Sequence, residues 1–150
     1  MAPYSKDQRE VVTIFNRQPW RLSLASNKSQ DTKIVPPGVR FRLEDGTLVS
    51  EVSTNEEIVI GRKPRDRDPN VTVQLDDHQG YKHGVSRYHA MIAVTNGYLV
   101  LRDLDSINGT LLNGQRCVKL NSYVLRSGDV IALGQMKLTI EFMDESPSIQ

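Results

Sequence analysis

Three short polar segments of the sequence carry the side chains that could perform chemistry. They are Gly61-Arg62, Ser86-Arg87 with His89, and Asn108-Gly109-Thr110. Arg62 can bind an oxyanion through two parallel hydrogen bonds, Ser86 offers a hydroxyl and a backbone N–H, and Asn108 offers a carboxamide. This set of donors suits a phosphate group, which presents several acceptor lone pairs. We therefore expect a phosphate-binding site if the fold brings the three segments together.

The same residues could instead suggest a catalytic triad of Ser86, His89 and either Asp103 or Asp105. No Gly-x-Ser-x-Gly elbow surrounds Ser86, and His89 lies too close along the chain to face the serine as a base. The histidines and the single cysteine lack the spacing of a zinc site, and no Walker or dinucleotide glycine motif is present. We therefore expect a binding protein that is not an enzyme and that uses no metal and no cofactor.

Short apolar runs separated by turn residues must form the scaffold that positions these segments. Strands are predicted at 39–43, 48–52, 57–60, 71–75, 88–95, 98–104, 111–112, 116–118, 130–133 and 136–142. The alternation of Met136, Leu138 and Ile140 with polar neighbours is typical of a strand with one buried face. No segment has a convincing helical period. Many short strands at this spacing predict an all-β sandwich.

Three Asn-Gly pairs give different predictions. Asn96-Gly97 and Asn113-Gly114 lie between apolar runs and predict two-residue hairpins, because a type I′ turn needs positive φ at both central residues. Asn108-Gly109 comes only five positions before the next pair, so a strand between two such hairpins would be too short. We therefore interpret Asn108-Gly109 as a loop that places its asparagine. Its neighbours, Asp105-Ser106-Ile107 before it and Thr110 after it, add side-chain donors and acceptors that can tie the loop down.

The beginning of the chain differs from the rest in the pattern of its polar and apolar residues. Residues 1–37 contain polar stretches around one apolar island, Val11 to Phe15, and end at Pro36-Pro37. We expect a flexible, mostly irregular N-terminal arm over 1–37, a β domain over 38–144 and a short C-terminal tail over 145–150.

The composition limits the class of partner and the compartment. The 150-residue chain has 19 Lys and Arg against 18 Asp and Glu, so bulk electrostatic binding to nucleic acid or to a membrane is not expected. Cys117 is the single cysteine, which excludes an intrachain disulfide and favours a reducing compartment. The start of the chain has no signal-peptide core, and no run approaches the ~18 apolar residues of a membrane helix. We expect a soluble cytoplasmic protein.

The polar segments, taken in order, resemble the forkhead-associated (FHA) domain family. The matching pattern consists of Gly61-Arg62, Ser86-Arg87-Tyr88-His89-Ala90, Ser106-Ile107-Asn108-Gly109-Thr110, Asn113-Gly114, Ser127-Gly128-Asp129-Val130-Ile131 and Leu133-Gly134. Each motif alone is weak, whereas their order and spacing together are specific. The resemblance covers about residues 39–143.

The resemblance implies an 11-stranded antiparallel β-sandwich whose loops bind a phosphothreonine peptide. Carried over by position, Arg62 and Ser86 would contact the phosphate. Arg87 would make a second phosphate or peptide contact, and Asn108 would hold the peptide main chain.

Other motif positions are implied to be structural, and they are Gly61, His89 and Gly109. The implied function is a phosphothreonine-dependent protein–protein interaction in signalling, with a Ser/Thr protein kinase or its substrate as the partner. A competing hypothesis is a structural or oligomerisation module on the same scaffold that does not need phosphate.

The sequence departs from the family pattern just before the serine. Residues 78–84 look like an insertion, and they add Lys82 and His83 beside the expected phosphate site. These two side chains either contact the phosphate and its flanks or belong to a solvated loop hinged by glycine. Ile107 stands where a threonine often precedes the motif asparagine, which removes one hydroxyl contact.

A threonine in the N-terminal arm is a candidate phosphorylation site. Some small bacterial members of the family carry a threonine motif near the N-terminus, and the domain binds that motif once a kinase has phosphorylated it. Thr13, followed by Ile14 and Phe15, loosely resembles such a site. Intramolecular capture would raise the effective concentration to about millimolar. The alternative is an apolar docking patch that is never modified.

Overall fold

The computed structural model describes residues 35–63 and 71–144, together with the backbone of residues 10–11 and 13–14. The chain divides into two compact units, Met1–Ile34 and Val35–Gln150. In the first unit, strands β1 (Glu10–Val11) and β2 (Thr13–Ile14) pair in antiparallel fashion. Most of the predicted arm, and the tail at 145–150, lie outside the described residues.

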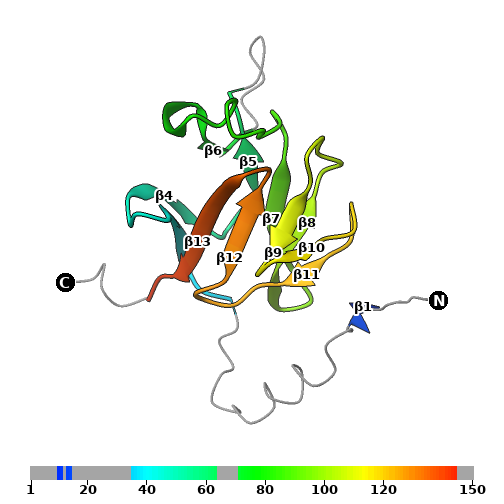
Figure 1. Ribbon diagram of the computed structural model, residues 1–150. Coiled ribbons are helices and arrows are strands. Elements are labelled where there is room, and N and C mark those ends of the chain that lie inside the picture. The colour runs from blue at the N-terminus through cyan, green and yellow to red at the C-terminus, as the bar shows by residue number, and fades with distance from the viewer. Residues whose placement is uncertain (1–9, 12, 15–34, 64–70, 145–150) are drawn as a thin grey trace. The chain divides into compact units, whose positions relative to one another are not determined.

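The described strands of the second unit form two sheets, which confirms the predicted 11-stranded sandwich (Figure 1). The six-stranded sheet has the order β10-β9-β12-β13-β3-β4. Its strands are β3 (Gly38–Leu43), β4 (Leu48–Ser53), β9 (Thr110–Leu112), β10 (Gln115–Arg116), β12 (Val130–Leu133) and β13 (Met136–Phe142). The five-stranded sheet has the order β11-β8-β7-β5-β6. Its strands are β5 (Ile58–Gly61), β6 (Val73–Gln74), β7 (Ala90–Thr95), β8 (Tyr98–Asp103) and β11 (Tyr123–Val124).

One strand pair departs from the antiparallel arrangement that the resemblance implies. Strands β5 and β6 are parallel, with Ile60 opposite Val73 and Gly61 opposite Gln74. Parallel neighbours need a connection that returns the chain to its starting end, and residues 62–72 provide that connection. The remaining pairs in both sheets are antiparallel among the described residues.

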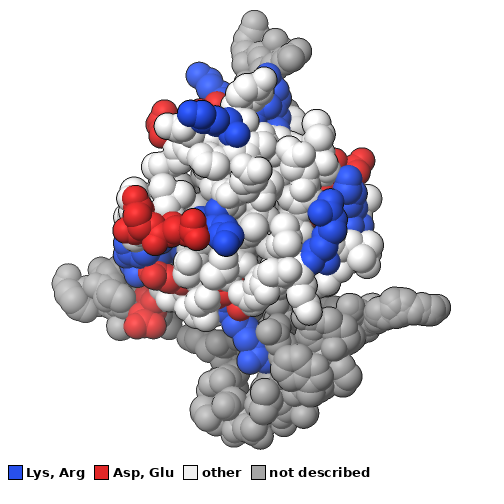
Figure 2. Space-filling view, viewed as in Figure 1, with Lys and Arg blue, Asp and Glu red and all other residues white. Residues whose placement is uncertain are grey.

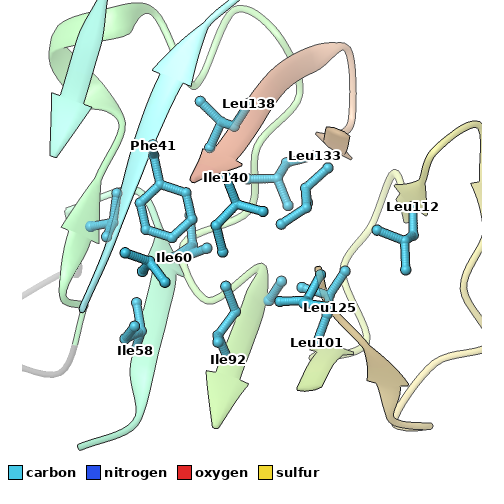
Figure 3. Close-up of a cluster of buried hydrophobic side chains, with 14 of the residues drawn as sticks. Phe41, Ile58, Ile60, Ile92, Leu101, Leu112, Leu125, Leu133, Leu138 and Ile140 are labelled. Carbon is cyan, nitrogen blue, oxygen red and sulfur yellow. The ribbon is translucent and has the colours of Figure 1, made fainter. Parts of the chain in front are cut away.

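Apolar side chains from the two sheets form one core (Figure 3). In β13, Met136, Leu138 and Ile140 are buried while Lys137 is exposed, so the predicted alternation is confirmed. The fully buried large side chains from both sheets include Phe41, Ile58, Ile60, Ile92, Leu99, Leu101, Ile131, Leu133, Leu138 and Ile140. Each such side chain stabilises the fold by about 1.5–3 kcal/mol relative to exposure. The loops that carry the three polar segments are therefore connected to strands with a well-packed core.

Both predicted Asn-Gly hairpins are confirmed. Asn96 and Gly97 have φ values of 53° and 82° between β7 and β8, and Asn113 and Gly114 have φ values of 50° and 86° between β9 and β10. Asn108-Gly109 forms no hairpin and lies in the loop that joins β8 to β9, as its spacing predicted.

Two small elements were not predicted from the sequence. A 3-10 helix, η1, spans Asp76–His78, where no helix was expected, and β11 spans only Tyr123–Val124. Predicted strand 71–75 is shorter in the structure, where β6 covers Val73–Gln74. Elements of two or three residues are too short to show a periodic pattern of apolar residues in the sequence, so they cannot be recognised from it. In the described part of the chain, no helix is long and apolar enough to cross a membrane.

Candidate functional site

The three polar segments singled out in the sequence meet at one end of the two sheets, at the top of Figure 1. The backbone N–H of Arg62 donates to the carbonyl oxygen of Ser86 at 3.2 Å. The backbone N–H of Ile107 donates to the Ser86 hydroxyl oxygen at 3.2 Å. Asn108 donates through Nδ2 to the carbonyl oxygen of Gly84 at 2.9 Å. The segment around Ser86 therefore lies between the other two and is bonded to both.

Gly61 allows the closest approach in this cluster. A Cβ atom at this buried position would collide with the carbonyl oxygen of Arg87 and would lie 2.8 Å from that of Ser86. The last residue of β5 therefore lies directly against the serine segment. Because no side chain fits there, only glycine lets Arg62 emerge beside Ser86.

Arg62 is held from two directions. Its Nε donates to the carbonyl oxygen of Val85 at 2.7 Å, and its Cζ lies 5.0 Å from the centre of the Tyr81 ring. The side chain is half-buried, and it forms no ion pair with any residue that the structure describes. The Nη1 and Nη2 edge of the guanidinium is thus left for an external anion.

Ser86 uses its backbone and its hydroxyl for different contacts. The backbone N–H donates to Nδ1 of His89 at 2.9 Å, while the hydroxyl oxygen accepts the N–H of Ile107. The hydroxyl proton donates to no described residue. It can therefore be offered to a ligand.

His89 is completely buried and braces two loops. Its Nδ1 accepts the N–H of Ser86, so the proton is on Nε2, which donates to the carbonyl oxygen of Gly109 at 2.9 Å. Burial lowers the pKa of His89, and the hydrogen bond to Gly109 and the charge of Asp103 offset only part of this effect. The neutral ring contacts the amide of Ser86 rather than its hydroxyl. The nucleophile–base contact of a catalytic triad is therefore not formed.

Asp103 is the buried centre of the loop that carries Asn108. Its carboxylate accepts the Ser106 hydroxyl at 2.6 Å, the Ser106 N–H at 3.0 Å and the Thr110 hydroxyl at 2.5 Å. Burial raises the pKa of Asp103, but the hydrogen bonds from Ser106 and Thr110 outweigh burial, so the net pKa is lowered. The Ser106 hydroxyl oxygen also accepts the N–H of Gly109 at 2.9 Å. The loop is thereby fixed around an ionised carboxylate.

Sequence reasoning anticipated Ser106 and Thr110 as ties but missed their partner. The alternation of side chains along β8 could have predicted that Asp103 is buried. Asp103 lies on the same strand face as Leu99 and Leu101, and that face is directed into the core. A buried carboxylate at that position requires nearby donors. Lys119 was missed altogether. Its Nζ donates to the carbonyl oxygen of Ser106 at 2.8 Å and lies 3.1 Å from Asp105, and this contact from a distant loop has no local sequence signal.

Asn108 is exposed and is positioned by Gly84. With φ at +83°, Gly84 takes a conformation that other residues rarely adopt, and a Cβ there would lie 2.7 Å from Nδ2 of Asn108. The carboxamide oxygen of Asn108 accepts no hydrogen bond from a described residue. It can therefore still bind the main chain of a peptide.

The other predicted site residues differ in how closely they approach the cluster. Arg87 is half-buried beside Arg62, and its Nη1 donates to the carbonyl oxygen of Lys63 at 3.3 Å. His83 is tied to its own loop, because its Nδ1 lies 2.9 Å from the carbonyl oxygen of Gln79. Lys82 is exposed and has no contact with the cluster among the described side chains. The geometry brings Arg62, Ser86, Arg87 and Asn108 together, with Lys82 and His83 at the margin.

The charge around this end of the domain favours an anion. Figure 2 shows Lys and Arg side chains gathered at the upper end, with fewer Asp and Glu side chains. On the left side of the same view, acidic and basic side chains lie next to one another. Arg40 and Arg42 of β3, both half-buried, form ion pairs with Glu51 and Glu141. Among the described residues, no group of three His, Cys, Asp or Glu could hold a metal ion.

The fold and the loop cluster define a class of protein, a β-sandwich that presents donors for an oxyanion at one end of its sheets. The sequence model of the FHA domain matches residues 58–134, which is just over half of the chain. The chain therefore belongs to the FHA domain family, as its motifs predicted. The members of this family are binding modules.

Solved structures of FHA domains are also similar to this chain. An FHA domain from a structural and functional analysis of phosphothreonine-dependent FHA domain interactions is 28% identical, with a TM-score of 0.54, over 72% of this chain and 99% of that one. The FhaA FHA domain, complexed with the intracellular domain of Rv3910, is 30% identical, with a TM-score of 0.52, over 69% and 99%. The FHA domain of an Arabidopsis thaliana protein is 28% identical, with a TM-score of 0.61, over 78% and 93%.

A curated relative shares a shorter segment. The ABC transporter ATP-binding/permease protein Rv1747 of Mycobacterium tuberculosis is 42% identical over 53 residues. These residues are 35% of this chain and only 6% of that protein. The similarity thus concerns one segment of a much longer protein.

Proposed function

We propose that this protein binds phosphothreonine peptides and acts as an adaptor in Ser/Thr kinase signalling. The observation that carries the proposal is the Nη edge of Arg62, which pairs with no residue that the structure describes, in the same loop cluster as the Ser86 hydroxyl and the Asn108 carboxamide. Two relatives support it, one from an analysis of phosphothreonine-dependent FHA domain interactions and one bound to the intracellular domain of another protein. The partner on this proposal is a phosphorylated protein, either a Ser/Thr kinase or its substrate.

Each side chain of the site has a separate role in binding the phosphopeptide. Arg62 binds two phosphate oxygens, the Ser86 hydroxyl donates to a third, and Arg87 adds positive charge. Asn108 orients the peptide main chain. Hydrogen bonds to charged groups contribute about 1.5–3 kcal/mol each, and three of them, less the cost of ordering the peptide, give an affinity of about micromolar. Such an affinity suits a reversible signalling contact.

The proposal also assigns a specificity and a compartment. A threonine methyl in a small pocket adds about 0.8 kcal/mol over serine, so phosphothreonine is the preferred ligand. The single, buried Cys117 fits a reducing compartment such as the cytoplasm. Nucleic acid and membranes are not partners on this proposal, since the net charge is only +1.

Calorimetric titration with a library of phosphothreonine peptides tests the proposal. Phosphorylated peptides should bind and their unphosphorylated versions should not, and Arg62→Ala should weaken binding at least about 100-fold because two charge-assisted bonds are lost. Arg40→Ala, which removes a half-buried arginine of β3 that pairs with Glu51, is the control and should bind normally.

The same titration discriminates the competing function, a phosphate-independent structural or oligomerisation module. That function requires equal binding of phosphorylated and unphosphorylated peptides, or binding that Arg62→Ala leaves unchanged. Either result would remove the phosphothreonine proposal.

The proposal extends to regulation by the protein's own N-terminal arm. Thr13, once phosphorylated, would occupy the Arg62 site of the same molecule at an effective concentration of about millimolar. Full-length protein with phosphothreonine incorporated at position 13 should bind an external phosphothreonine peptide at least about tenfold more weakly than unmodified protein. Unchanged affinity for the external peptide would refute the regulatory role of Thr13.

A further inference from the structure

The insertion before Ser86 is a folded loop with its own hydrogen bonds. The N–H of Gly80 donates to the carbonyl oxygen of Leu75 at 2.8 Å, and the N–H of Val85 donates to that of Gly80 at 2.9 Å. Leu75 and Val85 are both buried, so each end of the loop is anchored in the core. A Cβ on Gly80 would lie 2.9 Å from the Leu75 carbonyl oxygen. The path of the chain into Tyr81 is therefore fixed.

The side chain of this loop that reaches Arg62 is that of Tyr81. Its ring centre lies 5.0 Å from Cζ of Arg62, while His83 turns back onto the carbonyl oxygen of Gln79. Tyr81 is 77% exposed, so burial in the core does not explain its position. An aromatic face within about 6 Å of a guanidinium attracts that cation.

Arg62 is thereby confined on two sides. Its Nε donates to the carbonyl oxygen of Val85 at 2.7 Å, and its Cζ lies over the Tyr81 ring. The edge formed by Nη1 and Nη2 is what remains for a phosphate. A flexible arginine loses rotamer freedom when it is fixed, so an arginine that is already oriented binds its ligand at a smaller entropic cost.

We propose that Tyr81 is a positioning residue of the phosphopeptide site, which holds the Arg62 guanidinium so that its Nη edge faces the phosphate. This inference rests on the proposed function and deepens it. It assigns the insertion a part in binding through its aromatic side chain rather than through Lys82 or His83. On this proposal Tyr81 acts through Arg62 and not by binding the phosphate itself.

Binding of one phosphothreonine peptide to a set of variants tests the inference. Tyr81→Ala should weaken binding about two- to fivefold, whereas Tyr81→Phe, which keeps the ring, should stay within about twofold of wild type. Tyr98→Ala, at the opposite end of β8, is the tyrosine control and should leave the affinity unchanged. The thermal midpoint of Tyr81→Ala should equal that of wild type, since the side chain is exposed.

A spectroscopic measurement on the free protein separates positioning from general loop damage. The side-chain NMR signals of Arg62 should be shifted by the ring current in wild type and in Tyr81→Phe, and should revert toward ordinary values in Tyr81→Ala. If the Arg62 signals and the affinity do not respond to Tyr81→Ala while Arg62→Ala abolishes binding, the role of Tyr81 is refuted and the proposed function stands. If Arg62→Ala also binds normally, the proposed function itself has failed.

Discussion

His89 holds two loops of the site together through the position of one proton. Nδ1 must be unprotonated to accept the N–H of Ser86, while Nε2 must carry hydrogen to donate to Gly109. An imidazolium would place two N–H groups against each other at Nδ1. The connection between the two loops therefore depends on a histidine that stays neutral, and its burial is the main cause of its lowered pKa.

We therefore predict that the protein loses stability in mild acid as His89 takes up a proton. In the unfolded chain His89 takes up a proton near its ordinary pKa of 6.5, whereas in the folded protein it does so only at lower pH. Around and below pH 6.5 the unfolded state therefore binds more protons than the folded state. The contribution of His89 to the free energy of unfolding is complete above that pH, and it declines as the pH falls toward the pKa of His89 in the folded protein. The slope is at most about 1.4 kcal/mol per pH unit.

Urea unfolding at a series of pH values from about 7.5 to 5.5 measures this effect. His89→Gln keeps a donor and an acceptor but does not titrate, so it should be less stable and should lack this pH dependence. If that variant fails to fold, the ring nitrogen shifts of wild-type His89 give the same information. Equal slopes for wild type and variant, or a folded-state pKa of His89 at or above its ordinary value of 6.5, would contradict the interpretation.

At the level of elements, strands and two-residue hairpins could be predicted because their signals are local. The period of two in β13 and the Asn-Gly pairs at 96–97 and 113–114 need only neighbouring residues to be recognised. Elements and contacts that depend on distant residues could not be predicted. Examples are the hydrogen bonds that Asp103 accepts from the Asn108 loop, the contact of Lys119 with that loop, and the position of the Arg62 guanidinium over the Tyr81 ring.

The loop between β8 and β9 should depend on Ser106. Ser106→Ala removes the hydroxyl that donates to Asp103 and accepts from Gly109, leaving a buried carboxylate with fewer donors. The free energy of unfolding should fall by about 1–3 kcal/mol, and peptide affinity should fall as Asn108 loses its support. Because the loss of this hydrogen bond raises the folded-state pKa of Asp103 toward its ordinary value of 3.8, the free energy of unfolding of the variant should decline less than that of wild type as the pH falls below that value.

Chemical denaturation of Ser106→Ala beside Ser50→Ala provides the comparison. Ser50 is half-buried on β4 and lies far from the loops of the site along the sheet order, so its variant should change stability by less than about 0.5 kcal/mol. Equal effects of the two substitutions would mean that the Asp103 network does not hold the loop.

At the level of the whole molecule, the sandwich brings together side chains that are far apart in sequence. Residues 62, 86 and 108 come from three different connections, and two of these connections begin at the ends of β5 and β8 in one sheet. The order and spacing of the motifs were sufficient to predict the family, which the match over residues 58–134 confirms. They could not predict which residue of the 78–84 insertion would reach Arg62, because that depends on how the loop folds around Gly80.

The central claim is that a phosphate binds between Arg62, Ser86 and Asn108. It is tested most directly by NMR titration of labelled protein with a phosphothreonine peptide and with its unphosphorylated counterpart. We predict saturable shifts of the Arg62 side chain, the Ser86 amide and the Asn108 side-chain amide with the phosphorylated peptide alone. Shifts confined to another surface, or identical shifts with both peptides, would contradict the claim.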